Sequence, residues 1–279
     1  MISIIISSYQ DDYYSALEKN IAETIGIPYE IIKIDNPNLM GICEAYNKGA
    51  SLSKYDYLLF VHEDVIFHTK EWGQKLINHL KLENVGVIGV AGSNYVPQAP
   101  IGWHLPDDKY NFLYLIQNDK NSNQPKFINN IKSVQEVYAL DGVFMAVKKN
   151  IYSKFYFDEN LKGFHGYDLD FSLCVAQQYK NLVINDILIE HFSKGNPDLE
   201  WFKAVIYVRE KINFSYNKYN KFVEKLTFQV FLNNYFKYNR ISFRNIIFTF
   251  KFLSYSLSQD YFLDILKTYL YYLRLKKNG

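Results

Sequence analysis

Residues 55–67, YDYLLFVHEDVIF, are the stretch around which the rest of the chain can be arranged. The first half, residues 57–61, is a short apolar and aromatic run, which predicts a buried strand. The run ends at three ionisable side chains, His62, Glu63 and Asp64, before apolar residues resume. Open α/β folds bind ligands at the edge where strands end. We therefore expect a ligand site at this triplet; the alternative is a solvated strand end.

Strand and helix patterns alternate before this stretch. Residues 2–6 are mostly isoleucine and run into Ser8 and Tyr9, and residues 29–34 form a second apolar run that ends at Asp35. A helical pattern follows each run. Strand–helix–strand units at this spacing predict right-handed crossovers between parallel strands. The three strand ends should therefore meet at one edge of a nucleotide-binding-type sheet.

The strand pattern continues after the triplet, with one irregular segment. Residues 92–125 are punctuated by proline and glycine and contain Trp103. Loops of this length in compact domains are usually functional or mobile. We expect further strands at residues 85–91, 134–139, 143–147 and 181–189, and helices at 71–82 and from Asp168 onward.

Charge divides the chain into two parts. The net charge of +2 over 279 residues conceals 14 Lys and Arg against 4 Asp and Glu in residues 201–279, and 17 against 25 in residues 1–200. The basic part also has a helical, aromatic pattern. We predict a domain at 1–200 and a helical extension at 201–279 that faces an anionic partner. Nucleic acid fits poorly, because the first part is acidic.

Neither an export signal nor a membrane span is found in the sequence. Cys43 and Cys174 lie far apart in apolar patterns, so we expect reduced cysteines in a cytoplasmic protein. As helices, residues 201–279 would place aromatic side chains beside Lys and Arg, as membrane-surface helices do. Contact with the inner face of a membrane and packing against residues 1–200 or a second copy, as a homo-oligomer, remain alternatives.

An ordered set of motifs resembles family 2-type glycosyltransferases of the GT-A fold. In order they are SIIISSY, the strand that ends in Asp35, GICEAYNKGAS, HED, LDGVFMAVKK, GFHGYDLDFSL and EHFSKG, spanning about residues 1–195. The HED triplet in place of DXD resembles a bacterial branch of this family that carries a histidine there. The resemblance implies an α/β fold of the GT-A type, with a Rossmann-like mixed sheet flanked by helices.

The resemblance also implies an activity. It is the inverting transfer of a sugar from a nucleotide-diphosphate donor, a UDP-sugar, to a hydroxyl of a glycan or lipid-linked acceptor in bacterial surface polysaccharide synthesis. The alternative is a non-catalytic subunit that binds a sugar nucleotide within a glycosyltransferase complex. That alternative draws on the altered acidic motifs, HED and the Tyr167-Asp168 pair.

A diphosphate leaving group needs a positive counter-charge, which Mn²⁺ or Mg²⁺ held by carboxylates commonly supplies. We expect Asp64 to be a metal ligand. The resemblance implies a late metal or pyrophosphate contact at His191, a donor contact at His62, and Lys194 near the phosphates. Glu63 would either assist at the donor or turn inward. A purely structural role is the alternative for His191.

The acceptor hydroxyl needs a base. Asp168 and Asp170 lie two residues apart at a predicted helix start, which should expose them and where the helix dipole favours carboxylates. The resemblance implies that Asp168 is the catalytic base, with Tyr167 and Asp170 near the acceptor. Alternatively, Asp168 only caps the helix.

Further side chains are assigned to the pockets by the resemblance. It implies nucleotide contacts from Ser8, Tyr9 and Asp35 at the strand ends and from Asn47 on the second helix. Asp141 would line the donor pocket or form a plain turn. Trp103 would stack on an acceptor sugar or anchor its loop.

Overall fold

The computed structural model describes residues 1–118, 125–192, 195, 197–212, 216, 219–254 and 261–275. Its strands are β1 (Ile2–Ser8), β2 (Tyr29–Asp35), β3 (Tyr57–Val61), β4 (Val65–Phe67), β5 (Val85–Gly89), β6 (Ala91–Ser93), β7 (Asn111–Asn118), β8 (Pro125–Asn129), β9 (Gln135–Val137), β10 (Ala139–Leu140), β11 (Phe144–Lys148), β12 (Lys180–Val183) and β13 (Ile189–His191). Its helices are α1 (Asp11–Thr24), α2 (Ile42–Leu52), α3 (Trp72–Leu80), α4 (Lys149–Phe155), α5 (Tyr167–Ala176), α6 (Leu199–Lys211), α7 (Lys221–Tyr238), α8 (Phe243–Phe250) and α10 (Phe262–Leu275), with a short 3₁₀ helix at Asp108–Tyr110.

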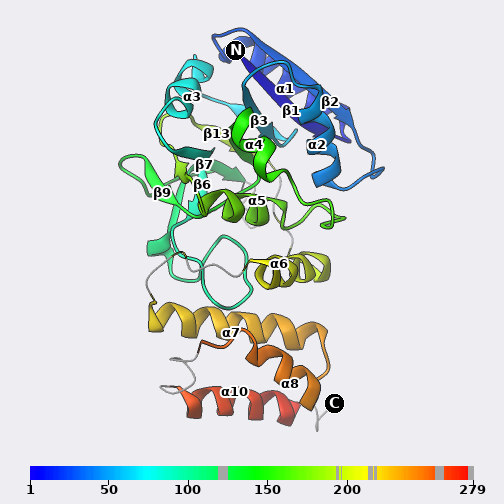
Figure 1. The fold of residues 1–279 in the computed structure, drawn as a ribbon, viewed down its shortest axis with the longest axis vertical. Helices are drawn as coiled ribbons and strands as arrows, with labels where there is room; N and C mark the ends of the chain where they lie inside the picture. The colour runs from blue at the N-terminus through cyan, green and yellow to red at the C-terminus, as the bar shows by residue number, and fades with distance from the viewer. Residues whose placement is uncertain are drawn as a thin grey trace.

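The larger sheet is mixed and, within the described residues, follows the order β2-β1-β3-β11-β5-β12-β9. Strand β1 runs parallel to both β2 and β3, and Ser8 pairs with Asp35 at its end. Strand β11 lies antiparallel on the other side of β3. The parallel crossovers expected for the first half are therefore confirmed, and the loops after β1, β2 and β3 meet at one edge (Figure 1).

A second sheet follows the order β10-β6-β7-β13-β4, with β8 paired to β7. Two expectations are wrong here. Residues 92–125, expected to be irregular, contain β7, and the single strand expected at 181–189 is two strands, β12 and β13, in different sheets. Because β4 follows the HED triplet and β13 ends at His191, this sheet brings the late histidine to the triplet.

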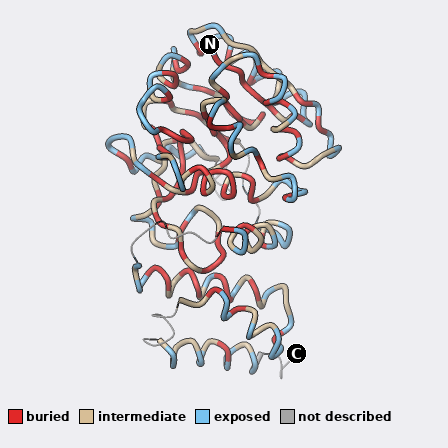
Figure 2. Tube along the Cα trace, in the orientation of Figure 1, coloured by how far each residue is buried: buried red, intermediate tan, exposed pale blue. Residues whose placement is uncertain are grey.

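The strands of the larger sheet are largely buried (Figure 2), and their side chains belong to two hydrophobic clusters. Ile4 and Leu59 belong to one cluster, with Leu17 of α1 and Trp72 of α3. Their neighbours along the strands, such as Phe60, point to the opposite face and pack with α2, α4 and α5. The sheet is thus covered on both faces, which leaves its strand ends as the place for a ligand.

Helices α6, α7, α8 and α10 are stacked at the end of the molecule away from the N-terminus (Figure 1). Helix α6 packs into the core beside the larger sheet, because Phe202, Val205 and Val208 are buried in the same cluster as Phe60 of β3. The division at residue 200 stays a prediction. None of the helices in the described residues is both long enough and apolar enough to span a membrane.

Candidate active site

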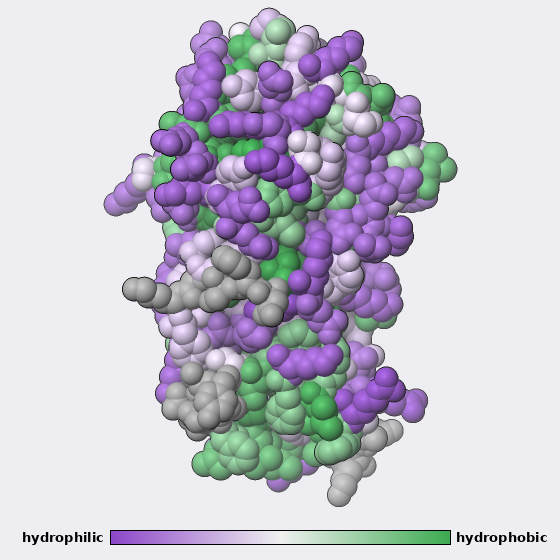
Figure 3. Space-filling model, viewed as in Figure 1, coloured by the Kyte–Doolittle hydropathy of each residue, from purple (hydrophilic) through white to green (hydrophobic). Residues whose placement is uncertain are grey.

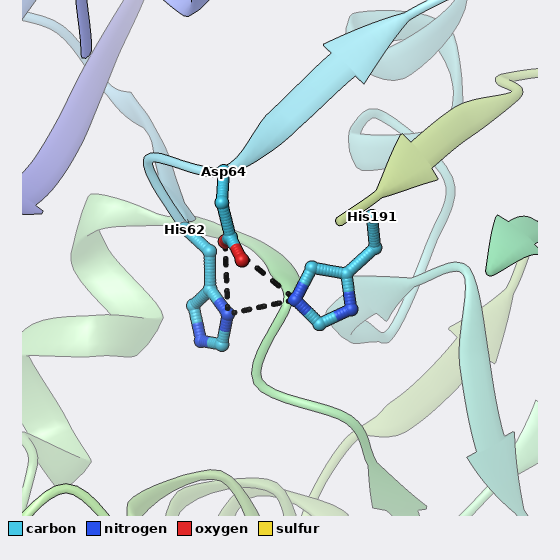
Figure 4. A group of neighbouring side chains, drawn as sticks. All are labelled: His62, Asp64 and His191. Carbon is cyan, nitrogen blue, oxygen red and sulfur yellow. Dashed lines mark hydrogen bonds and ion pairs between the residues drawn. The ribbon is translucent and has the colours of Figure 1, made fainter. Parts of the chain in front are cut away.

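His62, Asp64 and His191 point toward one another (Figure 4). His62 Nδ1 lies 3.4 Å from His191 Nε2 and 3.9 Å from Asp64 Oδ1, and His191 Nε2 lies 3.6 Å from that same oxygen. Three ligand atoms each about 2.1 Å from one ion would lie about 3–4 Å from one another. The three side chains therefore have the spacing of a shared metal site.

Backbone pairing between distant segments fixes this arrangement. The amide of His62 donates to the carbonyl of Val143 at 3.2 Å, which extends the β3–β11 ladder by one residue. The amide of Phe192 donates to the carbonyl of Asp64 at 3.1 Å, next to the pairing of β4 with β13. The triplet and His191 are thus held in register by both sheets.

Neighbouring side chains orient the two imidazole rings. The Tyr167 hydroxyl lies 2.7 Å from His62 Nε2, and Gln117 Oε1 lies 3.2 Å from His191 Nδ1. A Cβ at Gly142 would overlap the Tyr167 hydroxyl, so the glycine makes room for it. Metal-binding histidines usually have their second nitrogen held in this way. Gln117 was missed in the sequence because its strand, β7, was not recognised; the apolar and aromatic run at residues 112–116, FLYLI, was the available signal.

The donor set suits a transition metal. Burial lowers the pKa of His62, and the neighbouring His191 lowers it further, so the imidazole is neutral, as a metal ligand must be. Mg²⁺ prefers oxygen ligands, whereas imidazole nitrogens suit first-row transition ions, the series to which Mn²⁺ belongs while also taking carboxylate oxygens. Of the two cations expected from the sequence, these residues fit Mn²⁺ better.

Glu63 is turned toward the loop after β1. Its buried carboxylate accepts hydrogen bonds from the backbone amides of Tyr9 and Gln10 at 3.2–3.3 Å. These bonds hold the start of α1 against the HED triplet. The middle residue of the triplet therefore shapes the wall of the site.

A cavity of about 450 Å³ opens beside the three candidate ligands, within the usual size range of small-molecule sites. It brings together five side chains expected from the sequence: Tyr9, His62, Glu63, Asp64 and Tyr167. The cavity is also lined by residues that sequence reasoning missed, which are Ser7, Gln10, Tyr13, Asn38, Ile42, Tyr46, Phe164 and His165.

Asp168 lies in the first turn of α5, where its carboxylate accepts hydrogen bonds from the amides of Leu169 at 2.8 Å and Gly142 at 3.2 Å. The N-cap position belongs to Gly166. Burial, and then the nearby charge of Asp141, raise the pKa of Asp168 to about 7. Asp141 itself accepts a hydrogen bond from the amide of Val143 in a local turn. A carboxyl group with this pKa can exchange a proton near neutral pH.

Three residues expected at the nucleotide pocket lie elsewhere. Ser8 is buried, and its neighbour Ser7 lines the cavity instead. The exposed Asp35 forms an ion pair with Lys33 at 2.8 Å. Asn47 binds the backbone of Phe157 through both ends of its amide. The structure does not bring Asp35 or Asn47 to the cavity.

Two residues expected near the acceptor also lie away from the cavity. Asp170 is only 2% exposed and pairs with Lys211 of α6 at 2.9 Å, so its expected exposure is wrong. Trp103 borders a separate space of about 20 Å³ and packs against both buried clusters, which fits the loop-anchoring alternative. Lys194 lies outside the described residues.

Solved structures share this fold at low sequence identity. TarS of S. aureus, residues 1–349 in complex with UDP-GlcNAc, superimposes with a TM-score of 0.53 at 11% identity, over 92% of this chain and 83% of that one. GalNAc-T7 with UDP, GalNAc and Mn²⁺ gives a TM-score of 0.53 at 13% identity over 75% of this chain. The chain spans about half of the GalNAc-T7 chain, 47%. The α/β fold of the GT-A type is therefore confirmed.

No curated protein sequence matches the chain. A family model matches residues 3–227, from β1 into α7, and this region contains every strand of both sheets and the three candidate metal ligands. The chain belongs to the glycosyltransferase-like family that this model describes.

Proposed function

We propose that the chain is a metal-dependent, inverting glycosyltransferase that uses a UDP-sugar as donor. The observation that carries the proposal is the convergence of His62, Asp64 and His191 at a cavity of about 450 Å³, at the edge where β1 and β3 end. The solved relatives named above were crystallised with UDP, UDP-GlcNAc or Mn²⁺, which supports the choice of donor and cation.

In this proposal His62, Asp64 and His191 hold Mn²⁺, while Tyr167 and Gln117 keep the two imidazole rings in place. When bound, the ion supplies positive charge to the diphosphate that leaves the sugar. Tyr9 and the other side chains lining the cavity enclose the donor. The hydrogen bonds that Glu63 accepts from the amides of Tyr9 and Gln10 fix the loop that carries Tyr9. Ser8, Asp35 and Asn47 contribute indirectly, by shaping the strand ends and α2, and Lys194 remains a proposed phosphate contact.

Asp168 is the proposed base. With a pKa of about 7 it is largely ionised in mildly alkaline solution and can accept the proton of the acceptor hydroxyl as that oxygen attacks the sugar. A direct attack of this kind inverts the configuration of the sugar carbon. Asp141, beside Asp168, raises its basicity, and Tyr167, the residue before Asp168, lines the cavity. Asp170 supports the helix that carries the base, and Trp103 anchors the loop of the acceptor side.

The acceptor proposed is a glycan or lipid-linked hydroxyl in bacterial surface polysaccharide synthesis, at the inner face of a membrane. The basic extension supports this choice, because residues 201–279 carry 14 Lys and Arg against 4 Asp and Glu. Polyanionic or membrane-bound acceptors would be drawn to such a surface.

A donor screen tests the proposal. The purified chain is incubated with a panel of nucleotide sugars and Mn²⁺, and release of the nucleoside diphosphate is measured; for the donor that is cleaved, product NMR gives the anomeric configuration. We expect cleavage of a UDP-sugar, its loss with EDTA, and its loss in Asp64→Asn. Donor binding without cleavage of any member of the panel would instead favour the non-catalytic subunit.

A further inference from the structure

Helix α10 is apolar on two opposite faces. Its inner face packs on α7, where the rings of Tyr269 and Tyr272 lie 6.2 and 5.0 Å from the ring of Phe236. Its outer face carries four leucines at helical spacing that are 41–67% exposed: Leu263, Leu266, Leu270 and Leu273. An exposed apolar stripe on a helix normally faces a surface that covers it.

Helix α8 repeats this arrangement. On its inner face Phe248 stacks on Tyr235 of α7 with ring centroids 5.3 Å apart. On its outer face Phe243, Ile247 and Phe250, at positions i, i+4 and i+7, are 80%, 49% and 46% exposed.

The two helices are in contact, because the ring of Phe250 on α8 lies 5.5 Å from that of the buried Tyr269 on α10. Apolar surface gathers at this end of the molecule (Figure 3). We call the seven outward apolar side chains of α8 and α10 the α8–α10 face.

Cations flank the α8–α10 face. Arg244 and Lys251 follow the apolar stripe of α8, and Lys267 and Arg274 follow that of α10; all four are exposed. The only acid in the described part of residues 240–275 is Asp264, which pairs with Lys225 of α7 at 2.7 Å. Of the four cations, Lys251 pairs with Glu210 of α6 at 3.4 Å and Lys267 lies 3.9 Å from Asp264, so four positive charges at this border face two acids.

We propose that the α8–α10 face lies on an anionic lipid bilayer, with both helices parallel to its surface. Apolar side chains then enter the boundary between head groups and acyl chains, while Lys and Arg reach up to the phosphates. A second copy of the chain is a poorer occupant, because it would set the same cations against each other. The inference rests on the proposed function in one respect: a lipid-linked acceptor would be a reason for the protein to contact a membrane.

Vesicle sedimentation of the full chain tests this surface. The probe is large unilamellar vesicles of phosphatidylglycerol and phosphatidylcholine in equal parts, with vesicles of phosphatidylcholine alone for comparison. We expect binding to the mixed vesicles that declines with salt. The double variant Leu266→Gln with Leu270→Gln should bind at least about tenfold more weakly, and so should Lys267→Gln with Arg274→Gln.

The matched control is Leu52→Gln with Leu82→Gln, two leucines with 57% and 49% exposure on α2 and after α3. It should bind like the unchanged chain, and all variants should keep its melting temperature. Unchanged binding by the α10 leucine variant, or no binding by the natural chain, would overturn the proposal. So would a dimer in sedimentation velocity that this variant dissociates. Nucleotide-sugar cleavage, measured without vesicles, reports separately on the proposed function.

Discussion

At the scale of single residues, Asp168 is placed where two effects act in the same direction. Burial removes water from its carboxylate, and Asp141 adds a negative charge nearby, so its pKa rises from 3.8 to about 7. The amides of Leu169 and Gly142 hold the group in one orientation. A positioned base with a pKa near the working pH is what proton removal from a hydroxyl requires.

Asp168→Asn should therefore abolish transfer while donor binding persists. An amide cannot accept the proton, and general bases typically contribute about 10²–10⁴-fold to a rate. Transfer by the natural chain should fall as pH drops below about 7, because the carboxyl becomes protonated. Transfer rates across pH, with donor affinity from calorimetry, check both. Loss of donor binding along with transfer would indicate a structural role.

The same substitution should stabilise the fold. Since the folded state holds the proton more tightly than the unfolded chain, Asp168 lowers the free energy of unfolding as pH rises from 3.8 to about 7. Asparagine removes that loss, which is about 4 kcal/mol for a pKa shift of this size and about 1–3 kcal/mol once the partial exposure of the side chain is allowed for, or about 2–12 °C in melting temperature. Calorimetric scans should show the gain above pH 7 and its decline toward lower pH. A gain of the same size at every pH would contradict this explanation.

Gly142 offers a second test at this scale, because a methyl group there would displace the Tyr167 hydroxyl from His62. Gly142→Ala should weaken Mn²⁺ binding about 10–100-fold, the usual cost of losing such a supporting contact. Gly163→Ala is the matched control, since a Cβ at Gly163 meets nothing within 4 Å. Titration with Mn²⁺ measures both variants. Equal affinities in the two variants would show that the Tyr167–His62 contact does not matter for the metal.

At the scale of elements, helix geometry explains why Asp170 differs from Asp168. Residues two apart on an α-helix point to different sides. One carboxylate of α5 therefore accepts a hydrogen bond from the Gly142 amide, while the other faces α6 and is buried against Lys211. Asn47 on α2 is likewise directed at the Phe157 backbone. The motifs located the right elements, but which side of a helix faces the cavity depends on how the helices pack.

Lys211 links α6 to two acids, Asp158 at 2.7 Å and Asp170 at 2.9 Å. Burial lowers the pKa of Lys211, but these hydrogen bonds outweigh it and raise the pKa overall. Lys211→Met should destabilise the chain by about 1–3 kcal/mol, because it leaves a buried carboxylate unpaired. Urea unfolding measures the change, and adding Asp170→Asn should restore part of the loss.

The control for this prediction is Lys203→Met, also on α6. Its pair with Glu200 is exposed on both sides, at 60% and 68%, so its removal should have no measurable effect. Equal losses in the two variants would mean that helix α6 is sensitive to any change of charge, and the link to Asp170 would be refuted.

The burial of each strand explains how clearly the sequence predicts it. Strands β1, β3 and β5 are buried on both faces, so they appear in the sequence as continuous apolar runs. Strand β7 is mostly half-exposed, with only Asn111 and Leu115 buried, and it follows a segment rich in proline and glycine. Its pairing with β13, far along the chain, is not visible in the local sequence. The HED triplet and His191 were both recognised, but Gln117, which orients His191, was lost with its strand.

At the scale of the whole molecule, the candidate site joins the two sheets. His62 continues β3 of the larger sheet, whereas Asp64 and His191 flank the pairing of β4 with β13 in the second. Gln117 comes from β7 of the same second sheet. An ion shared by the three ligands would hold the two sheets together, so its binding energy should resist unfolding of the entire domain.

Mn²⁺ and UDP together should accordingly raise the melting temperature of the natural chain. A ligand at about 100 times its dissociation constant adds about 2.7 kcal/mol to the free energy of unfolding, which corresponds to about 5–10 °C. Differential scanning calorimetry with Mn²⁺, UDP, both, or both plus EDTA measures the shift. UDP should act weakly without Mn²⁺, because its diphosphate needs the ion, and Asp64→Asn should abolish the joint effect. A full shift with UDP and EDTA would mean that nucleotide binding does not pass through His62, Asp64 and His191.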